Sequence, residues 1–293
     1  RWQDAHLAER QESLQALAFP FPQYREGQRT MAAYIYRMIR EEGGLFLQAP
    51  TGIGKTISAL FPALKAMGQG LTSKIFYLTA TALSAQEALS KIEAQRPELL
   101  TVSLTAKDKI CPFPESHCNP AECVYAKGHY DRVRDAIFTV IEREKRMDRQ
   151  RIQEYAKQFM VCPFELELDI STWSDVIIGD YNYAFDPTAS LKRFFQEGKS
   201  DYTLLVDEAH NLQRRGAAPG SGKTAAFLYG TSFLLSAQIT SQTGGDSGMA
   251  HRTQGKPAGW RNDDRDGAFR RVLSASAGFE SASIRIFGGR GGR

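Results

Sequence analysis

The sequence predicts an α/β fold with a parallel sheet that is covered by helices on both faces. Three observations support this prediction: short β-rich runs recur along the chain, stretches of helical period separate them, and a glycine-rich loop joins one run to the helix after it. With 293 residues and 42% apolar content, the chain is long enough for one large domain or two ordinary ones.

Helices and strands alternate from Gln28 onward. Gln28–Arg40 has a helical pattern with one apolar face, made by Met31, Tyr34, Ile35 and Met38. The predicted core strands are Leu45–Gln48, Lys74–Thr79, Leu100–Leu104, Asp175–Gly179 and Thr203–Val206. The predicted helices between the first three strands are Thr56–Met67 and Ala82–Ala94.

The run Ala49-Pro-Thr-Gly-Ile-Gly-Lys-Thr56 has the composition of a phosphate-binding loop, although Ala49 replaces the first glycine of the usual pattern. Backbone N–H groups of such a loop can surround a polyphosphate at the positive end of the following helix. We expect Lys55 to reach the β- and γ-phosphates of ATP and the Thr56 hydroxyl to hold Mg²⁺. A Gly/Thr turn without a nucleotide is the alternative. The residues expected to contact the nucleotide are Thr51, Gly52, Ile53, Gly54, Lys55 and Thr56.

A second motif, Leu204-Leu-Val-Asp-Glu-Ala-His210, places two carboxylates at the end of an apolar run. The carboxyl ends of parallel strands open on the ligand crevice of an α/β sheet. Asp207 is expected to steady the Mg²⁺ shell, and Glu208 to orient and deprotonate the water that attacks the γ-phosphate. We expect His210 to link this site to a neighbouring domain. An Asp-Glu pair alone can be a helix N-cap, but together with the glycine-rich loop it predicts an ATP site.

The pattern changes between Lys107 and Thr172, where Asp131–Arg149 and Arg151–Phe159 are charged and helix-forming. This change predicts a helical insertion in the α/β domain, with most of the charges on a solvated helical hairpin. All the cysteines lie in or beside the insertion: Cys111, Cys118, Cys123 and Cys162. Because no export signal is present, clustered cysteines favour a metal site over disulfides.

Four thiolates suit either a tetrahedral Zn²⁺ or a 4Fe–4S cluster. No C-x-x-C pair is present, which argues against a ribbon-type zinc site, while His117 and His129 are further candidates for zinc ligands. Four unrelated buried thiols are the remaining alternative. The spacing of the cysteines alone does not separate zinc from iron–sulfur.

Taken together, the motifs resemble the XPD/DinG-like iron–sulfur DNA helicases of superfamily 2. The resemblance covers about residues 17–212 and is carried, in order, by Ala49–Thr56, Thr79-Ala-Thr81, the cysteine insertion and Val206–Leu212. Two further stretches, Lys107–Cys111 and Val161–Phe164 with the following Asp175–Tyr183, resemble the surroundings of that family's first and fourth cluster cysteines. The resemblance implies a RecA-like P-loop domain with an arch-like helical insertion. It also implies a 4Fe–4S cluster on the four cysteines, beside which the strands of a duplex separate.

The resemblance also implies roles for individual residues. Gln28, within Tyr24–Gln28, is expected to contact the adenine. Thr79 and Thr81 are expected to contact the DNA backbone without sequence readout. Lys107 stands where the family tends to have a basic residue near the cluster, although an exposed lysine is also an ordinary surface residue. The implied activity is that of an ATP-dependent DNA helicase moving 5′→3′ on single-stranded or forked DNA.

Residues 213–293 differ from the rest of the chain. They hold 15 of the 25 glycines and 12 Lys/Arg against 5 Asp/Glu, so the formal charge of +4 arises there. We interpret them as an irregular tail without a packing role, such as an out-of-frame product, and a Gly/Arg-rich RNA-binding tail is the alternative. Thr224–Ile239 has the period of a short helix. Gly220–Thr224 is a chance match to a phosphate loop, since no apolar strand precedes it.

The predicted organisation follows from these boundaries. Residues 1–106 and 173–212 form the RecA-like domain, 107–172 the helical insertion and 213–293 the tail. The second RecA-like domain, which such helicases carry in the same chain and which supplies arginines to the γ-phosphate, is missing from these residues. We therefore expect the chain to bind ATP and Mg²⁺ but to separate no strands alone.

The composition indicates where in the cell the protein is expected, but it leaves two function classes besides a helicase open. The chain has no run of 18 apolar residues and no signal-peptide pattern, so we expect a cytoplasmic protein without a membrane partner. Since it begins at Arg1 and not at Met, we expect a fragment. The alternatives to a helicase are another P-loop kinase or ATPase, and a non-enzymatic module with structural zinc and a degenerate nucleotide site.

Overall fold

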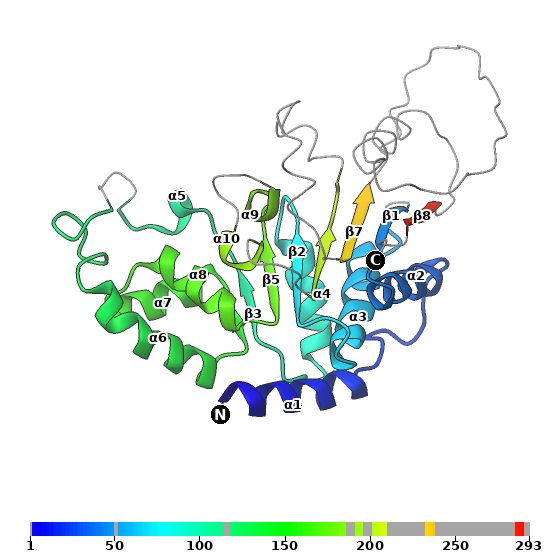
Figure 1. Cartoon of the computed structure of the whole chain (residues 1–293), viewed down its shortest axis with the longest axis horizontal. Coiled ribbons are helices and arrows are strands. Elements are labelled where there is room, and N and C mark those ends of the chain that lie inside the picture. Colours follow the sequence, from blue (N-terminus) through cyan, green and yellow to red (C-terminus); the bar gives the residue numbers. More distant parts are fainter. Residues whose placement is uncertain are drawn as a thin grey trace, which may run out of the picture.

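The computed structural model describes residues 2–49, 52–113, 118–185, 191–195 and 201–209, with the backbone of 232–237 and 285–289. These residues form one sheet with helices packed around it (Figure 1). The strand order is β4-β3-β5-β2-β6-β7-β1-β8, and every neighbouring pair is parallel except the antiparallel pair β1–β8. The predicted α/β class with a parallel sheet is confirmed.

The strands are β1 (Gly44–Gln48), β2 (Lys74–Leu78), β3 (Thr101–Ser103), β4 (Arg146–Met147), β5 (Val176–Gly179), β6 (Tyr202–Val206), β7 (Ser232–Ala237) and β8 (Arg285–Gly289). The longer helices are α1 (Trp2–Ala16), α2 (Gln28–Arg40), α3 (Lys55–Gly68), α4 (Leu83–Glu93), α6 (His129–Arg143), α7 (Arg149–Phe159) and α8 (Pro163–Trp173). The short helices are α5 (Lys107–Ile110), α9 (Asn182–Phe185) and α10 (Lys192–Phe195). No helix in the described part of the chain is long and apolar enough to cross a membrane.

The two faces of the sheet are buried in two different hydrophobic clusters. Successive side chains of a strand point to opposite faces. In β2, Ile75 and Tyr77 belong to the cluster formed with α2, α3 and α4, whereas Phe76 and Leu78 belong to the cluster formed with α6, α7 and α8. The helical insertion therefore covers one face of the sheet, and the helix that follows the glycine-rich loop covers the other.

Helix α1 crosses the amino ends of the strands, along the lower edge of the molecule in Figure 1. Its His6 and Arg10 side chains donate to the buried Asp175 carboxylate, at 2.9 and 2.5 Å. The N–H of Leu100 donates to the same carboxylate at 2.8 Å. Burial raises the pKa of Asp175, but the bonds and charges of His6 and Arg10 outweigh burial and hold the pKa below its usual value. The carboxylate thus joins α1 to the residues that directly precede β3 and β5.

The predicted strands all form, and helix α2 has the predicted bounds. The helix predicted over Asp131–Arg149 is wrong at its end, because α6 stops at Arg143 and β4 follows at the edge of the sheet. The side chain of Asp148 accepts the N–H of Arg151 at 3.0 Å, which caps the start of α7 and ends continuity with α6.

The prediction of an irregular tail is wrong at two segments. Ser232–Ala237 form β7 between β6 and β1, so the helix predicted over Thr224–Ile239 is wrong there. Arg285–Gly289 form β8 at the outer edge of β1. A short apolar run fits a buried strand as well as a helix, and between two strands all of its backbone groups find partners. The rest of residues 213–293 lies outside the described residues.

Candidate nucleotide-binding site

The glycine-rich loop leaves the carboxyl end of β1 and leads into α3. Gly52 and Gly54 have φ values of +81° and +80°, in the left-handed region that favours glycine. A Cβ on Gly54 would lie 2.5 Å from Nε2 of Gln28, so a side chain there would displace its neighbour. These glycines are required by the backbone path and by close approach. Pro50 and Thr51 lie outside the described residues.

Gln28 and Arg25 hold the loop from the side of α2. The buried Gln28 amide donates to the Ile53 carbonyl at 2.6 Å and accepts the N–H of Arg25 at 2.8 Å. The Arg25 guanidinium donates to the Gly52 carbonyl at 2.5 Å. Gln28 therefore has a structural task in fixing the loop, and its contact with an adenine stays a prediction.

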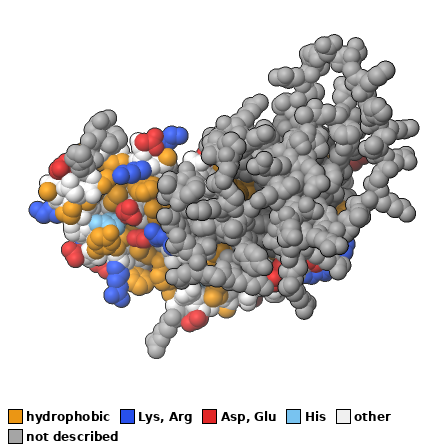
Figure 2. All heavy atoms as spheres, turned by 45° about the horizontal axis from the view of Figure 1, so that its top comes forward, with side chains coloured by type: hydrophobic (Ala, Val, Ile, Leu, Met, Phe, Trp, Pro, Cys, Tyr) orange, Lys and Arg blue, Asp and Glu red, His pale blue; other side chains and the backbone are white. Residues whose placement is uncertain are grey.

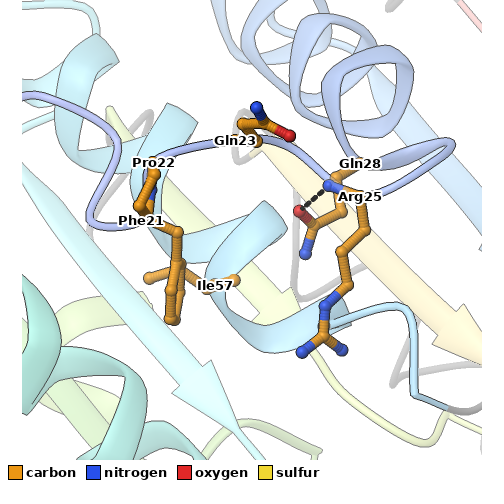
Figure 3. Close-up of a pocket in the computed structure, with 7 residues that line it drawn as sticks. Phe21, Pro22, Gln23, Arg25, Gln28 and Ile57 are labelled. Carbon is orange, nitrogen blue, oxygen red and sulfur yellow. Dashed lines mark hydrogen bonds between the residues drawn. The ribbon is translucent and has the colours of Figure 1, made fainter.

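A hollow of about 390 Å³ opens beside the loop (Figure 3). In Figure 3, the ring of Phe21 and the side chain of Ile57 stand on one side, and Gln28 and Arg25 on the other. An apolar wall opposite a few polar groups is typical of small-molecule sites. The lining residues are Phe21, Pro22, Gln23, Arg25, Gln28, Gly54 and Ile57.

Lys55, the first residue of α3, faces the acidic motif after β6. Its Nζ lies 3.5 Å from Oε1 of Glu208. The amine is buried and, among the described residues, has no hydrogen-bond acceptor. A buried cation without enough acceptors is costly unless an anion pairs with it. Lys55 is therefore placed to take a further anion, such as a phosphate oxygen.

Two tyrosines anchor the acidic motif. The Tyr77 phenol donates to Oδ2 of Asp207 at 3.0 Å, and the Tyr181 phenol donates to the Asp207 carbonyl at 2.6 Å. Burial, the Asp207 charge and the Asp207 bond raise the pKa of Tyr77 well above its usual value. Glu208 itself has a φ of +48°, which is rare for a residue with a side chain. Strain of this kind tends to gather at functional sites.

The structure thus brings together Lys55, Thr56, Asp207 and Glu208 at the carboxyl end of the sheet. Thr56 directly follows Lys55 in the first turn of α3. A cation, a hydroxyl and two carboxylates form a donor set for a metal–polyphosphate ligand, with a base near the terminal phosphate. His210 lies outside the described residues.

Three cysteines of the insertion share one neighbour. Lys107 interacts most strongly with Cys118 and more weakly with Cys111 and Cys162. Together these thiols raise the pKa of Lys107. Burial raises the pKa of the Cys162 thiol, and Cys123 is buried as well.

Arg132 and His129 fix the backbone around the other cysteine positions. The Arg132 guanidinium donates to the carbonyls of Lys127 and Met160, both at 2.6 Å. Nδ1 of His129 accepts the N–H of Cys162 at 3.1 Å, and burial lowers the pKa of this imidazole. These bonds connect the segment after Cys123 to the segment before Cys162.

The described cysteines do not form a finished metal site. Among the residues that the structure describes, no three His, Cys, Asp or Glu side chains are arranged to hold a metal ion. His117 lies outside those residues, and Nδ1 of His129 is engaged by Cys162. The four cysteines belong to one lobe, and the described ones do not form such a group in this structure.

The residues predicted to contact DNA differ in their exposure. The Thr79 side chain is buried, and its hydroxyl donates to the Thr81 carbonyl at 3.2 Å. Thr81 and Lys107 are exposed. Figure 2 shows apolar side chains gathered on the surface of the helical lobe. The exposed large apolar residues of the insertion are Phe113, Val124, Tyr130, Phe138 and Met160.

Sequence reasoning missed the contacts that hold the motifs in place. It did not single out Arg25, Tyr77, Tyr181 or Arg132. A tyrosine in an apolar run gives one signal that could have found Tyr77: a buried phenol needs a hydrogen-bond partner, and the polar loop and acidic motif lie at the same sheet edge.

Residues 96–223 match the family DEAD_2. The probable ATP-dependent helicase MJ0942 of Methanocaldococcus jannaschii is 24% identical over 199 residues, which cover 67% of this chain and 29% of the relative. The general transcription and DNA repair factor IIH helicase subunit XPD/RAD3 of Saccharomyces cerevisiae is 21% identical over 230 residues, covering 66% of this chain and 29% of the relative. Among solved structures, an XPD helicase has a TM-score of 0.43 at 19% identity, covering 66% of this chain and 34% of that structure.

The matched residues include one part of the candidate site and leave out another. The family match includes all four cysteines and the acidic motif, and it begins after the glycine-rich loop. It continues to residue 223, past Leu212, where the sequence motifs end. The chain spans less than a third of the length of these two curated relatives.

Proposed function

We infer that this chain, which belongs to the XPD/DinG-like family of superfamily 2 helicases, binds ATP with Mg²⁺ and hydrolyses it as part of an ATP-dependent DNA helicase. The observation that carries this proposal is the 3.5 Å approach of Lys55 to Glu208. It joins the glycine-rich loop of β1 to the acidic motif of β6, two motifs that are far apart in sequence.

Each residue would have a distinct task in hydrolysis. Lys55 would exchange its contact with Glu208 for the β- and γ-phosphate oxygens, which frees the Glu208 carboxylate. Glu208 would then accept a proton from the attacking water. Thr56 and Asp207 would hold the metal, which supplies charge neutralisation at the phosphates when bound. Loop N–H groups would bind the same phosphates at the start of α3.

The test is a calorimetric titration of the whole chain with ATP in the presence of Mg²⁺, followed by a phosphate-release assay. Wild-type protein is expected to bind and hydrolyse ATP, and Lys55→Ala to lose both. Lys65→Ala is the matched control, because Lys65 lies on the same helix and donates to the Gln15 and Leu17 carbonyls, away from the site. Equal binding by wild type and Lys55→Ala would contradict the proposal.

We propose that the nucleic-acid partner is single-stranded or forked DNA. Thr81 and Lys107 are exposed near the carboxyl edge of the sheet and the cysteine lobe, where they can meet phosphates. Tyr130, 87% exposed, offers a ring on which a base can stack. Stimulation of ATP hydrolysis by single-stranded DNA would support this partner, and hydrolysis indifferent to DNA would oppose it.

We propose further that movement is 5′→3′ and that strand separation needs a second RecA-like domain, which supplies arginines to the γ-phosphate. Such an arginine contributes about 10³–10⁵ in rate. The chain alone is therefore expected to turn ATP over slowly and to leave a forked duplex intact. Measured unwinding by this chain alone would refute the requirement for a second domain.

We also propose that the four cysteines hold a 4Fe–4S cluster, with Zn²⁺ as the alternative. The interaction of Cys111, Cys118 and Cys162 with the same lysine, Lys107, supports a shared site. Cluster binding would require the thiols to close around it. Iron, sulfide and zinc content of protein purified without oxygen separates the two metals, and the absence of both would leave four independent thiols.

A further inference from the structure

Tyr77 occupies the boundary between the core and the proposed nucleotide site. It stands on β2, next to the carboxyl end of the strand, and is 2% exposed. Its ring packs in the cluster on the α3 face of the sheet. Its hydroxyl leaves that apolar environment at the point where the glycine-rich loop and the acidic motif meet.

The phenol contacts the acidic motif directly. It donates its single proton to Oδ2 of Asp207 at 3.0 Å. The Tyr181 phenol donates to the Asp207 carbonyl at 2.6 Å, so a tyrosine holds both the side chain and the backbone of Asp207.

This bond has the polarity that a metal site requires. A carboxylate that steadies the metal shell needs a fixed orientation, which a neighbouring donor provides. Tyr77 is such a donor to Asp207.

We propose that Tyr77 is a positioning residue that orients the Asp207 carboxylate for a divalent cation bound with the nucleotide. This inference rests on the proposed ATP–Mg²⁺ site and adds a residue to it. Tyr77 touches neither the cation nor the phosphate in this role. It acts through the Asp207 side chain.

The experiment compares wild type with Tyr77→Phe, which keeps the ring in the core and removes only the hydroxyl. Nucleotide binding is titrated with ADP at a series of Mn²⁺ concentrations, with free Mn²⁺ measured by electron paramagnetic resonance. Loss of an outer-shell partner weakens metal affinity by about 10–100-fold. We expect Tyr77→Phe to need that much more Mn²⁺, while ADP binding without metal changes by less than about twofold.

The matched control is Tyr155→Phe. Tyr155 is also a buried tyrosine whose phenol donates to a carboxylate, at 2.8 Å from Glu144, but it lies in the helical insertion. It should keep the wild-type Mn²⁺ dependence. Unfolding midpoints without ligand show whether both variants fold. Asp207→Asn provides a second test. In a protein that already carries Asp207→Asn, adding Tyr77→Phe should change the Mn²⁺ dependence much less than it does in the wild type.

The outcomes separate the inference from its premise. An unchanged Mn²⁺ dependence in Tyr77→Phe would overturn the role of Tyr77, and so would an equal loss in Tyr155→Phe. If wild type binds no nucleotide at any Mn²⁺ concentration, the proposed function itself fails. If ADP binding without metal falls as far as binding with metal, Tyr77 supports the fold of the loop only, and the positioning role is overturned.

Discussion

The nucleotide site and the cysteine lobe are held in place by different kinds of contact. At the nucleotide site the motifs follow strand ends, two left-handed glycines shape the loop, and side-chain bonds from Gln28 and Tyr77 hold Ile53 and Asp207. In the cysteine lobe, bonds from Arg132 and His129 fix the backbone near Cys123 and Cys162, while Cys118 is exposed. The nucleotide site is therefore formed by the backbone and its contacts, whereas the cysteine lobe brings the thiols into one region without placing them as metal ligands.

This difference indicates which of the two sites forms before its ligand binds. A loop that is fixed by backbone geometry can exist before its ligand arrives, as phosphate loops do. A multi-thiolate site seldom exists in advance, so the free energy of metal binding becomes free energy of folding. We therefore expect the metal to organise the cysteine lobe and the nucleotide to enter a site that is already formed.

Metal removal should have the largest effect. Structural metal sites contribute on the order of 10 kcal/mol, so chelation should greatly speed amide exchange around Cys111–Cys123 and Cys162. Exchange in β1, β2 and α3 should stay nearly unchanged. Hydrogen-exchange mass spectrometry of loaded and stripped protein measures both regions at once.

The control for metal removal is Cys162→Ser, which should show fast exchange in the cysteine lobe without any chelator. Equal loss of protection in both regions would mean that the metal supports the whole domain. No loss in either region would leave the thiols without a metal.

The second prediction concerns Glu167, which connects α8 of the helical insertion to the end of β3. This fully buried carboxyl on α8 accepts the N–H of Thr105 through both oxygens, at 3.0 and 3.1 Å. Burial raises its pKa to about 9, so the folded state keeps it neutral. An acid with a raised folded-state pKa gives stability that is complete below its unfolded pKa and lost as pH rises toward the folded pKa.

Stability should therefore fall from about pH 5 toward pH 9, by up to about 1.4 kcal/mol per unit from this group. Glu167→Gln keeps an oxygen for Thr105 and has no charge, so it should flatten this slope and be the more stable protein at about pH 8. Denaturant unfolding across pH measures it. Glu154→Gln, at an exposed position, is the control, and identical slopes in Glu167→Gln and wild type would contradict the prediction.

The third prediction tests how rigid the glycine-rich loop is. Gly54→Ala should be unfavourable for two reasons: position 54 has a left-handed φ, and the added Cβ would lie 2.5 Å from Nε2 of Gln28. Backbone strain of this kind costs about 1–3 kcal/mol, and nucleotide affinity should fall because Gln28 must move. Gly70→Ala has a similar φ of +73° with its nearest contact at 3.6 Å, so it should lose stability but keep nucleotide affinity. Equal affinities in the two variants would show that the loop adapts.

The strands and the main motifs could be predicted because local patterns determine them. Each apolar run that was predicted as a core strand is one, and parallel pairing of β6 with β7 and of β7 with β1 places the carboxyl ends of β6 and β1 at the same edge of the sheet. The approach of Glu208 to Lys55 follows from that placement. The sequence was sufficient wherever a motif sat at a strand end.

The remaining features depend on contacts that no local pattern contains. Helix α1 buries His6, Arg10 and Leu14, so two of its three buried residues are polar and it lacks a hydrophobic stripe. Tyr77 looks like an ordinary core residue until Asp207, 130 positions away, meets it. Strand β7 was predicted as helix because its partners, β1 and β6, are distant in sequence.

The smallest effect is expected for Arg132→Lys, which tests how the cysteine lobe is held before metal binds. The guanidinium donates to the Lys127 and Met160 carbonyls through Nη2 and to the Phe159 carbonyl through Nε. A lysine keeps the charge but cannot reproduce this fork, so about 1 kcal/mol should be lost. Because these bonds join the backbone after Cys123 to the backbone before Cys162, the iron content of purified protein should fall while ATP affinity stays constant.

Arg134→Lys on the same helix, where the side chain lies over Phe138 at the surface, should retain the full iron content. Unchanged iron in Arg132→Lys would mean that the thiols gather without this support, and that the metal alone arranges the lobe.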